Sequence, residues 1–184
     1  MRGPLILASA SPRRLDLLRQ VGIEPAAIDP AQLDETPLPA EAPRSYALRM
    51  ALAKFAEVAP RHPGACVLAA DSVVAVGRRI LPKAESEKDA RACLALLSGR
   101  RHKVLGGLAV GVDGKPRTRL VETAVRFKRL EADEIEAYIE SGEWQGKAGG
   151  YAIQGRAAQF VNFISGSYSN VVGLPLFETM MLLK

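Results

Sequence analysis

The sequence predicts an α/β fold built on an elongated mixed β-sheet with flanking helices. Short apolar runs typical of buried strands alternate with segments in which apolar residues recur at helical spacing. Helices between some strands favour parallel crossovers, whereas Asp113-Gly114 between two extended runs is a strong hairpin signal and favours antiparallel pairing. With 184 residues and no internal repeat or interior linker, one domain over residues 1–184 is expected.

In the first half of the chain, strands and helices alternate. Pro12 suits the first turn of a helix, and Gly22 suits its end. Pro43 and Pro60 delimit a second helix, whose expected apolar stripe is Leu48, Leu52, Phe55 and Ala59. The expected elements are a strand at 5–8, helices at 12–21 and 43–59, a proline-rich loop at 25–42, a central strand at 66–70, and extended segments at 73–76 and 80–81 around Gly77.

The second half of the chain shows equally clear boundaries. Ser98-Gly99 ends one helix, and Gly142 ends another. Four glycines between residues 146 and 155 predict a loop in which the backbone closely approaches a ligand. The expected elements are helices at 87–97 and 132–141, hairpin strands at 104–112 and 118–127, a last strand at 160–164, and a terminal helix from Pro175.

Composition limits the classes of function. Net charge is +5 without a basic tract, which suits an anionic small substrate, and aromatic residues, at 5%, are sparse for a base-stacking surface. Two cysteines and two histidines, all scattered, are too few for a zinc site, and Cys66 and Cys93 are expected to be packing residues. The N-terminus does not resemble a signal peptide, and no segment has membrane-spanning length. A cytoplasmic protein that binds neither nucleic acid nor membrane is expected.

An anion site is predicted where the first strand meets the first helix. Ser9 and Ser11 supply hydroxyls, Arg13 and Arg14 supply guanidinium groups, and the helix start supplies free backbone N–H groups. Phosphate is the anion that this combination suits. The alternative is an ordinary capped helix with two solvated arginines.

Asp71 is the first candidate for catalysis. It follows an apolar run, and a carboxylate at the carboxyl end of a buried strand lies where open α/β sheets bind ligands. Its alternative role is to cap a turn with Ser72. Lys54, on the flank of the second helix, and Lys83 are weaker candidates that solvation alone would explain. Glu35, from the acidic loop, can join Asp71 in holding a hard divalent cation.

The glycine-rich segment 147–155 is a candidate for binding a base. Lys147 offers a cation, and the Gln154 amide both donates and accepts hydrogen bonds, which suits a nucleobase edge. Tyr151 and Ile153 alternate as buried residues would, and Trp144 is expected to pack beside the loop. The alternative is a flexible surface turn.

These segments together resemble the Maf-type nucleoside triphosphate pyrophosphatases, from Leu5 to Leu183. The matching segments are LASASPRR at 7–14, LDET at 33–36, Lys54, ADSVV at 70–74, ILPK at 80–83, LSG at 97–99, KAGGYAIQG at 147–155 and NVVGLP at 170–175.

The resemblance implies a cytoplasmic, homodimeric enzyme, a hydrolase acting on acid anhydrides, with a sheet like that of inosine triphosphatases. It implies cleavage of a nucleoside triphosphate between the α and β phosphates with a divalent cation such as Mg²⁺ or Mn²⁺. Residue by residue, it implies that Asp71 is the proton acceptor that activates water and that Glu35 is an essential acidic group. It also assigns polar and cationic contacts to the substrate phosphates: Ser9, Arg13, Arg14, Lys54 and Lys83, with Lys147 as a further substrate contact.

Substrate choice rests on three positions in this resemblance. Arg13, Ser72 and Gln154 match the branch that acts on dTTP and UTP, whereas the branch acting on 7-methyl-GTP has tryptophan, glutamine and glutamate there. Two departures are evident: Ser72 replaces the usual threonine, and Pro82-Lys83-Ala84 replaces glycine-lysine-proline. The sequence leaves open how Ala84 affects the conformation around Lys83, and which metal or modified pyrimidine is preferred.

Other classes of function remain as alternatives. The family is also linked to arrest of septum formation, so a non-catalytic regulator is one of them, and a small RNA-binding domain is another. A binding module would not need Asp71, and the few aromatic residues disfavour RNA. The residues favour phosphoryl chemistry, because a general base, cations and a metal supply its parts.

Overall fold

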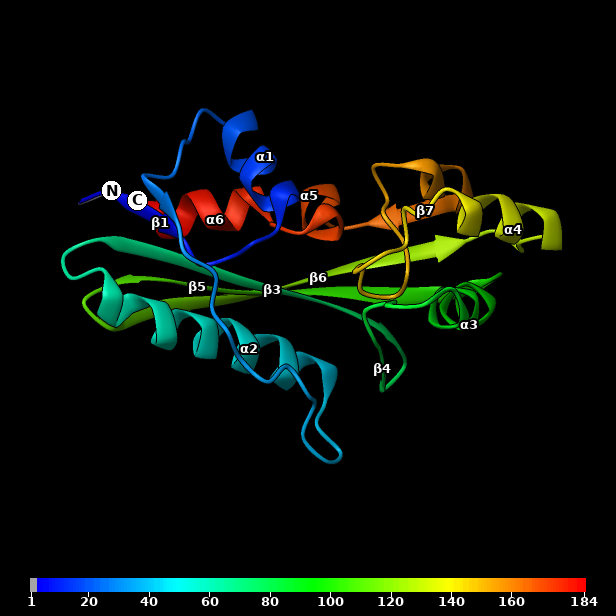
Figure 1. Cartoon of the computed structure of the whole chain (residues 1–184), viewed down its shortest axis with the longest axis horizontal. Coiled ribbons are helices and arrows are strands. Elements are labelled where there is room, and N and C mark those ends of the chain that lie inside the picture. The colour runs from blue at the N-terminus through cyan, green and yellow to red at the C-terminus, as the bar shows by residue number, and fades with distance from the viewer. Residues whose placement is uncertain (1–2) are drawn as a thin grey trace.

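The computed structural model describes residues 3–184 and confirms the α/β class with a mixed sheet (Figure 1). Seven strands lie in one sheet in the order β2-β1-β3-β5-β6-β7, and β4 pairs with β3 outside this path. The strands β1 and β2, and likewise β1 and β3, are parallel, whereas the other pairs are antiparallel. The strands are β1 (Leu5–Leu7), β2 (Ala27–Ile28), β3 (Cys66–Val76), β4 (Arg79–Leu81), β5 (Arg101–Val112), β6 (Lys115–Phe127) and β7 (Val161–Ser165).

The helices form layers on both faces of this sheet. They are α1 (Pro12–Gln20), α2 (Pro43–Val58), α3 (Glu87–Leu97), α4 (Ala132–Glu140), α5 (Tyr168–Val172) and α6 (Leu176–Leu183), with 3₁₀ turns at Ala59–Arg61 and Arg156–Phe160. Figure 1 shows α2 below the long central strands, α1, α5 and α6 above them, and α3 and α4 at the opposite end from the termini. No helix in residues 3–184 is long and apolar enough to cross a membrane.

The central strand β3 separates two sides of the core by its alternation. Leu68, Ala70 and Val74 belong to the larger cluster, with α1, α3 and α6, whereas Val67 and Ala69 pack with α2. This alternation follows from the period of two in a strand. The hairpin between β5 and β6 is also confirmed, since Asp113 and Gly114 adopt φ of 49° and 74° at its turn.

Asp71 does not lie at the end of its strand, so that prediction is wrong. β3 continues through Asp71, which pairs with Gly107 of β5, because the antiparallel ladder with β5 extends the strand to Val76. The parallel neighbour β1, by contrast, stops at Leu7, opposite Leu68. Asp71 therefore lies just beyond the end of β1, where the parallel part of the sheet opens.

The predicted stripe of the second helix is also wrong in part. Leu52 is exposed, and the buried face instead includes Ala47, Ala51 and Lys54. Close packing of α2 against the sheet explains which residues are buried, because a Cβ on Gly107 would lie 2.1 Å from the Ala47 carbonyl oxygen. Small residues therefore face the sheet, and Lys54 lies on the buried face rather than on its flank.

Smaller differences between the predicted and the observed elements occur where contacts with distant segments determine the local structure. The short strand β2 and helix α5 were not expected, and both depend on neighbours. Ser11 occupies the N-cap of α1, but its side chain makes no capping bond. The bounds of α3 agree with the prediction, and Ser86 and Asp89 form a reciprocal capping box at its start. Both cysteines are buried and free, as expected.

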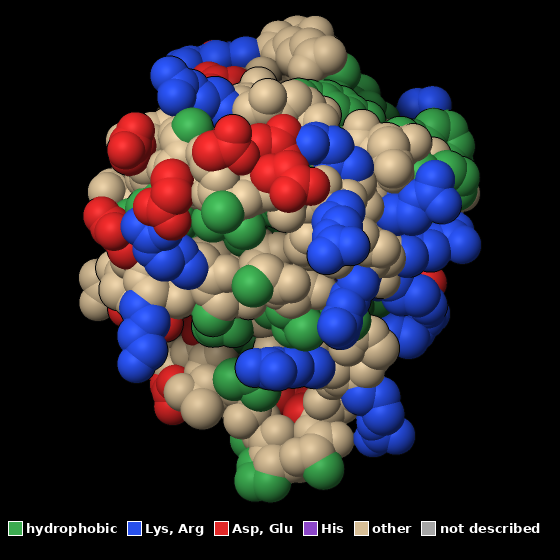
Figure 2. Space-filling view, turned by 90° about the vertical axis from the view of Figure 1, so that its right-hand side faces the viewer, with side chains coloured by type: hydrophobic (Ala, Val, Ile, Leu, Met, Phe, Trp, Pro, Cys, Tyr) green, Lys and Arg blue, Asp and Glu red, His purple; other side chains and the backbone are tan. Residues whose placement is uncertain are grey.

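The surface charge is uneven in space. Figure 2 shows the end of the molecule on the right of Figure 1, with Lys and Arg side chains in the centre and on the right and acidic side chains mostly at the upper left. The net charge of +5 is spread along the sequence. Further Lys and Arg side chains lie at the upper left and left of this view, so basic side chains are densest in the centre and on the right but are not confined there (Figure 2).

Candidate active site

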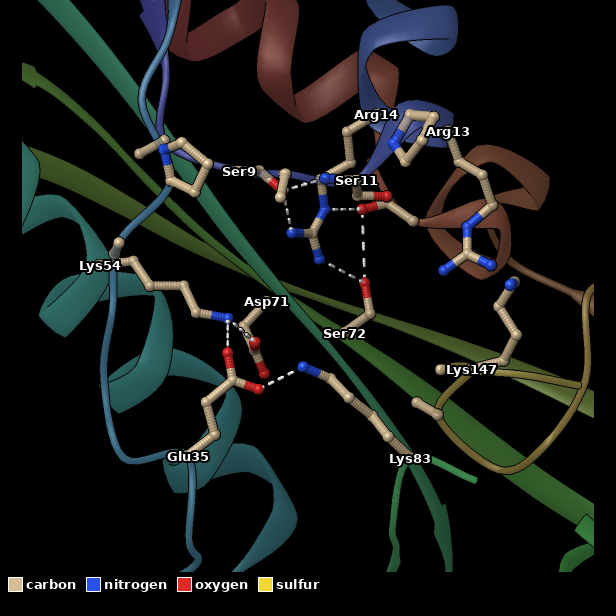
Figure 3. Close-up of a pocket in the computed structure, with 18 residues that line it drawn as sticks. Ser9, Ser11, Arg13, Arg14, Glu35, Lys54, Asp71, Ser72, Lys83 and Lys147 are labelled. Carbon is tan, nitrogen blue, oxygen red and sulfur yellow. Dashed lines mark hydrogen bonds and ion pairs between the residues drawn. The ribbon is translucent and has the colours of Figure 1, made fainter. Parts of the chain in front are cut away.

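A cavity of about 450 Å³ lies where β1 ends and β3 continues (Figure 3). It brings together side chains from the β1–α1 turn, the loop after β2, α2, β3, the segment after β4 and the glycine-rich loop. Its lining includes nearly all of the predicted site residues: Ser9, Ser11, Arg13, Arg14, Glu35, Lys54, Asp71, Ser72, Lys83 and Lys147.

A chain of four alternating charges crosses this cavity. The Lys54 ammonium nitrogen lies 2.6 Å from Asp71 Oδ1 and 2.7 Å from Glu35 Oε1. The other carboxylate oxygen of Glu35 accepts from Lys83. Asp71 and Lys54 are both buried, because β3 and the buried face of α2 carry them. Two carboxylates and two ammonium groups therefore converge from four separate segments.

Glu35 is ionised throughout the physiological range. Burial by itself would raise its pKa, but the hydrogen bonds and charges of Lys54 and Lys83 outweigh this effect and lower the pKa to about 2. The Tyr46 hydroxyl on α2 donates to the Glu35 carbonyl oxygen at 2.6 Å. Tyr46 thus holds the loop at Glu35, a role that the sequence pattern did not suggest.

Arg14 makes its hydrogen bonds to the protein itself. It is buried, and its Nε donates to the Gly173 carbonyl at 2.9 Å, while Nη1 and Nη2 donate to the hydroxyls of Ser9 and Ser72 at 2.8 and 3.2 Å. Burial lowers the pKa of Arg14, whereas the charges of Asp71 and Glu35 act to raise it. Arg14 therefore joins three segments and leaves its charge close to Asp71.

Gly173 is a site residue that the sequence reasoning missed. Its carbonyl accepts from Arg14 and also from the Ser72 hydroxyl, at 3.3 Å. Its φ of 149° and ψ of −3° suit glycine, because a Cβ disfavours this region. The available signal was the glycine in the NVVGLP segment, which lies directly after α5.

Arg13 and Lys147 form a second group of cations, in which Glu143 is the acidic side chain that acts on Lys147. Figure 3 shows their charged ends turned toward one another from α1 and the glycine-rich loop. Burial and the neighbouring Arg14 lower the pKa of Arg13, and burial and Arg13 lower the pKa of Lys147. Arg13 Nε has no hydrogen-bond partner among the described residues. Such a pair of like charges favours an anion between them.

The three predicted specificity residues lie together. Arg13, Ser72 and Gln154 line one small cavity of about 30 Å³ beside the larger one, although Gln154 itself is exposed. Tyr151 and Ile153 are buried, and Trp144 is buried with its indole N–H on the Ile139 carbonyl at 2.9 Å. The glycine-rich segment is therefore held in place and is not a free surface turn.

The departure at Ala84 adds a link between two loops. The Ala84 N–H donates to the Lys147 carbonyl at 3.1 Å, and the Ala84 carbonyl accepts from the Gly146 N–H at 2.8 Å. A proline at this position would lack the N–H for the first of these bonds. The backbone next to Lys83 is thereby joined to the loop that carries Lys147.

The donor set fits a divalent cation that is shared with a substrate. Glu35 and Asp71 each place an oxygen within hydrogen-bond distance of the same Lys54 nitrogen. No group of three or more His, Cys, Asp or Glu residues suited to a metal exists within the described part of the chain. Mg²⁺ is typically held by one or two carboxylates together with substrate phosphates, which matches this pair. Glu35 and Asp71, the two predicted ligands, both line the cavity.

This arrangement suits attack on a phosphate anhydride. A carboxylate flanked by cations can accept a proton from water, while the cations neutralise charge on several phosphate oxygens. The lining offers four guanidinium or ammonium groups besides Lys147, and one helix N-terminus at α1.

Comparison with known proteins gives a consistent result. Residues 4–184 match the family model described as Maf-like protein. The chain is 64% identical over 182 residues to a protein of Rhodospirillum rubrum named dTTP/UTP pyrophosphatase, covering 98% of this chain and 87% of that protein. Proteins of the same name from Paramagnetospirillum magneticum and Caulobacter vibrioides are 64% and 63% identical, covering 97% and 99% of this chain and 95% of each relative.

Proposed function

The chain belongs to the Maf-like protein family, and we propose that it hydrolyses dTTP and UTP to nucleoside monophosphate and pyrophosphate. The observation that carries this proposal is the position of Asp71, a buried carboxylate among the cations of the cavity. The names of the relatives, at 63–64% identity over nearly the whole chain, support the same substrates.

In this proposal Asp71 is the general base. It takes a proton from the water that attacks the α phosphorus, and the bond from that phosphorus to the bridging oxygen breaks. Pyrophosphate then leaves with the bridging oxygen. Lys54 orients Asp71 through the contact at 2.6 Å. The role of a base requires a carboxylate within hydrogen-bond reach of the reacting water, and Asp71 lines the cavity in which that water would lie.

The other cations bind and orient the triphosphate. Lys83, Arg13 and Lys147 have charged ends that face the cavity and can neutralise phosphate oxygens as charge moves onto the leaving group (Figure 3). Arg14 acts differently, because its bonds to Ser9, Ser72 and Gly173 make it the residue that positions the two serines.

A divalent cation is part of the proposal. Glu35 and Asp71 would hold it, and it would supply charge neutralisation on the phosphate oxygens. Treatment with a chelator is expected to abolish pyrophosphate release, and Mg²⁺ or Mn²⁺ is expected to restore it. Activity that persists after exhaustive chelation would contradict the metal assignment.

Pyrimidine selection is assigned to Arg13, Ser72 and Gln154. The Gln154 amide can donate to a pyrimidine carbonyl and accept from the neighbouring ring N–H. That these three residues line one cavity supports the assignment. A 7-methyl-GTP preference is disfavoured, because that branch has other residues at all three positions.

The proposal also covers the domain organisation, the location in the cell and the oligomeric state. We infer a single domain that acts in the cytoplasm as a homodimer. Phe177 and Met181, four residues apart on α6, are 73% and 51% exposed, and an apolar stripe of this kind suits coverage by a second copy. Light scattering of the parent protein and of Phe177→Glu tests this, and a monomeric parent would refute it.

The decisive experiment compares the parent protein with Asp71→Asn. The parent should release pyrophosphate, not orthophosphate, from dTTP and UTP. Asp71→Asn should lower kcat by about 10²- to 10⁴-fold, the usual contribution of general-base catalysis, with the fold intact by circular dichroism. Near-normal turnover of the variant would refute the role of Asp71. A parent inactive on every nucleoside triphosphate would favour the non-catalytic regulator.

A further inference from the structure

A buried histidine lies in contact with the glycine-rich loop, and the reaction described above does not use it. His102 on β5 is 1% exposed, and its Nε2 lies 2.8 Å from the Tyr151 hydroxyl. Its ring also packs edge-on against Phe127 and Tyr151, with centroids 5.1 and 5.5 Å apart. Burying the polar groups of His102 and Tyr151 among aromatic rings costs desolvation free energy that apolar residues in the same space would not cost. A function that needs their hydrogen bond would explain this cost.

The contact is a hydrogen bond between neutral groups at neutral pH. Burial lowers the pKa of His102 to about 4, with a smaller opposing effect of the Arg100 backbone. Burial raises the pKa of Tyr151, so it favours the neutral form of this residue too. The pair is therefore not an ion pair, and its strength is set by geometry and by exclusion of water.

The next residue of the loop is held by a second tyrosine. The Ala152 N–H donates to the Tyr138 hydroxyl at 3.1 Å, and Tyr138 belongs to α4. Tyr151 and Ala152 are thus both tied to other elements through phenol oxygens. No comparable side-chain bond holds Gln154 among the described residues, so its position depends on these neighbours.

The loop needs such ties because its own backbone is permissive. Gly149 and Gly150 adopt φ of 67° and 68°, and glycine loses more conformational freedom on ordering than any other residue. Backbone bonds to Pro82 and Ala84 hold the first part of the loop, near Lys147. Tyr151 and Ala152 hold the part that leads to Gln154, and the backbone after Gln154 is held by the Gly155 N–H on the Ala152 carbonyl at 3.1 Å and the Arg156 N–H on Glu143 at 2.7 Å.

We propose that His102 and Tyr151 are positioning residues, whose hydrogen bond holds the glycine-rich loop so that Gln154 faces Arg13 and Ser72. Tyr151 belongs to the lining of the cavity that Arg13, Ser72 and Gln154 share, whereas His102 lies behind it and acts through Tyr151 and the loop. This inference rests on the proposed function, since it concerns how the same site recognises its pyrimidine substrate. Its structural part, the ordering of residues 147–155, holds independently of turnover.

Tyr151→Phe is the sharpest test, because it removes the hydroxyl and keeps the ring. Loss of one net hydrogen bond is expected to raise KM for dTTP by about 2- to 10-fold, with kcat within about 2-fold of the parent value. Tyr168→Phe is the matched control, because Tyr168 is 52% exposed on α5 and its hydroxyl makes no hydrogen bond within the described residues. An unchanged KM in Tyr151→Phe would overturn the proposal.

The double variant His102→Phe/Tyr151→Phe separates positioning from stability. His102→Phe alone leaves the Tyr151 hydroxyl buried and unpaired, so its stability should fall, and the double variant should recover part of that loss. KM should nevertheless remain raised in the double variant. A KM that returns to the parent value together with stability would show a merely structural role and overturn the proposal.

Hydrogen exchange gives a readout that does not depend on activity. Amides of residues 147–155 should exchange faster in Tyr151→Phe than in the parent, whereas Tyr168→Phe should match the parent. Equal exchange in all three proteins would refute the positioning role. If the parent releases no pyrophosphate, the proposed function fails, and the exchange experiment still decides whether the pair orders the loop.

Discussion

Replacing Lys54 with methionine is expected to destabilise the protein by about 3 kcal/mol at pH 7. The change removes the ammonium that lies 2.6 Å from Asp71 and leaves a buried carboxylate without its closest countercharge. Methionine is unbranched and similar in size to the lysine stem, so the change in packing is small. The loss should therefore come mainly from the unpaired charge of Asp71.

The size of this loss of stability follows from how exposed the side chains of Lys54, Asp71 and Glu35 are. The side chains of Lys54 and Asp71 are 10% and 7% exposed, and removal of one member of a buried ion pair typically costs about 3–5 kcal/mol. Glu35 contributes less, because its side chain is 31% exposed and it keeps Lys83. Arg14 also compensates Asp71 in part, since their charges interact. These two effects favour the low end of the range.

Urea denaturation of four proteins tests this reasoning. The parent, Lys54→Met, Asp71→Asn and the double variant Lys54→Met/Asp71→Asn are compared at pH 7 with m values checked for constancy. The double variant should be more stable than Lys54→Met, because it removes the unpaired charge. Lys88→Met, at an exposed lysine of α3, is the control and should match the parent. A Lys54→Met variant within about 1 kcal/mol of the parent would refute the argument.

Three further predictions concern the same site. Gly173→Ala should lower both stability and kcat/KM, because a Cβ strains the backbone at φ 149° whose carbonyl holds Arg14 and Ser72; denaturation and steady-state kinetics measure the two effects. Gln154→Glu should lower kcat/KM for dTTP by about 5-fold or more, because a carboxylate cannot donate to a pyrimidine carbonyl, and an unchanged dTTP to 7-methyl-GTP ratio would contradict this. The pKa of Glu35 is lowered from 4.5 to about 2, so its contribution to stability is present above pH 4.5 and is lost as pH falls toward 2. Glu35→Gln should therefore flatten the dependence of unfolding free energy on pH in that window, and an equally steep dependence in the variant would exclude Glu35 as its source.

The elements that the sequence predicts best have strong local signals. Helix α3 starts and ends as expected, because Ser86 and Asp89 cap its first turn and Gly99 with φ 69° follows its last. The β5–β6 turn agrees because Asp113-Gly114 favours left-handed backbone conformations. Such boundaries depend on the conformational preferences of a few consecutive residues, which the sequence contains in full.

The residue types of the site were also evident from short segments. Ser9 lies in the short turn between β1 and α1, and Arg13 and Arg14 lie in the first turn of α1, so their joint position follows from local geometry. The same holds for Asp71 and Ser72, which are neighbours on β3. The sequence alone could therefore indicate a phosphate-binding corner and a candidate base.

Tertiary structure decided how these segments meet. Whether β3 ends at Ala70 or continues to Val76 depends on its ladder with β5, a contact between residues far apart in the chain. The placement of Lys54 on the buried face depends on the close approach of α2 to Gly107, which no local pattern reveals. The carbonyl of Gly173 lies 101 positions from Ser72 in sequence and yet accepts its hydroxyl. Side-chain types and turns are local properties and can be inferred from the sequence, whereas the pairing of buried charges is set by sheet register and helix packing, which only the folded chain determines.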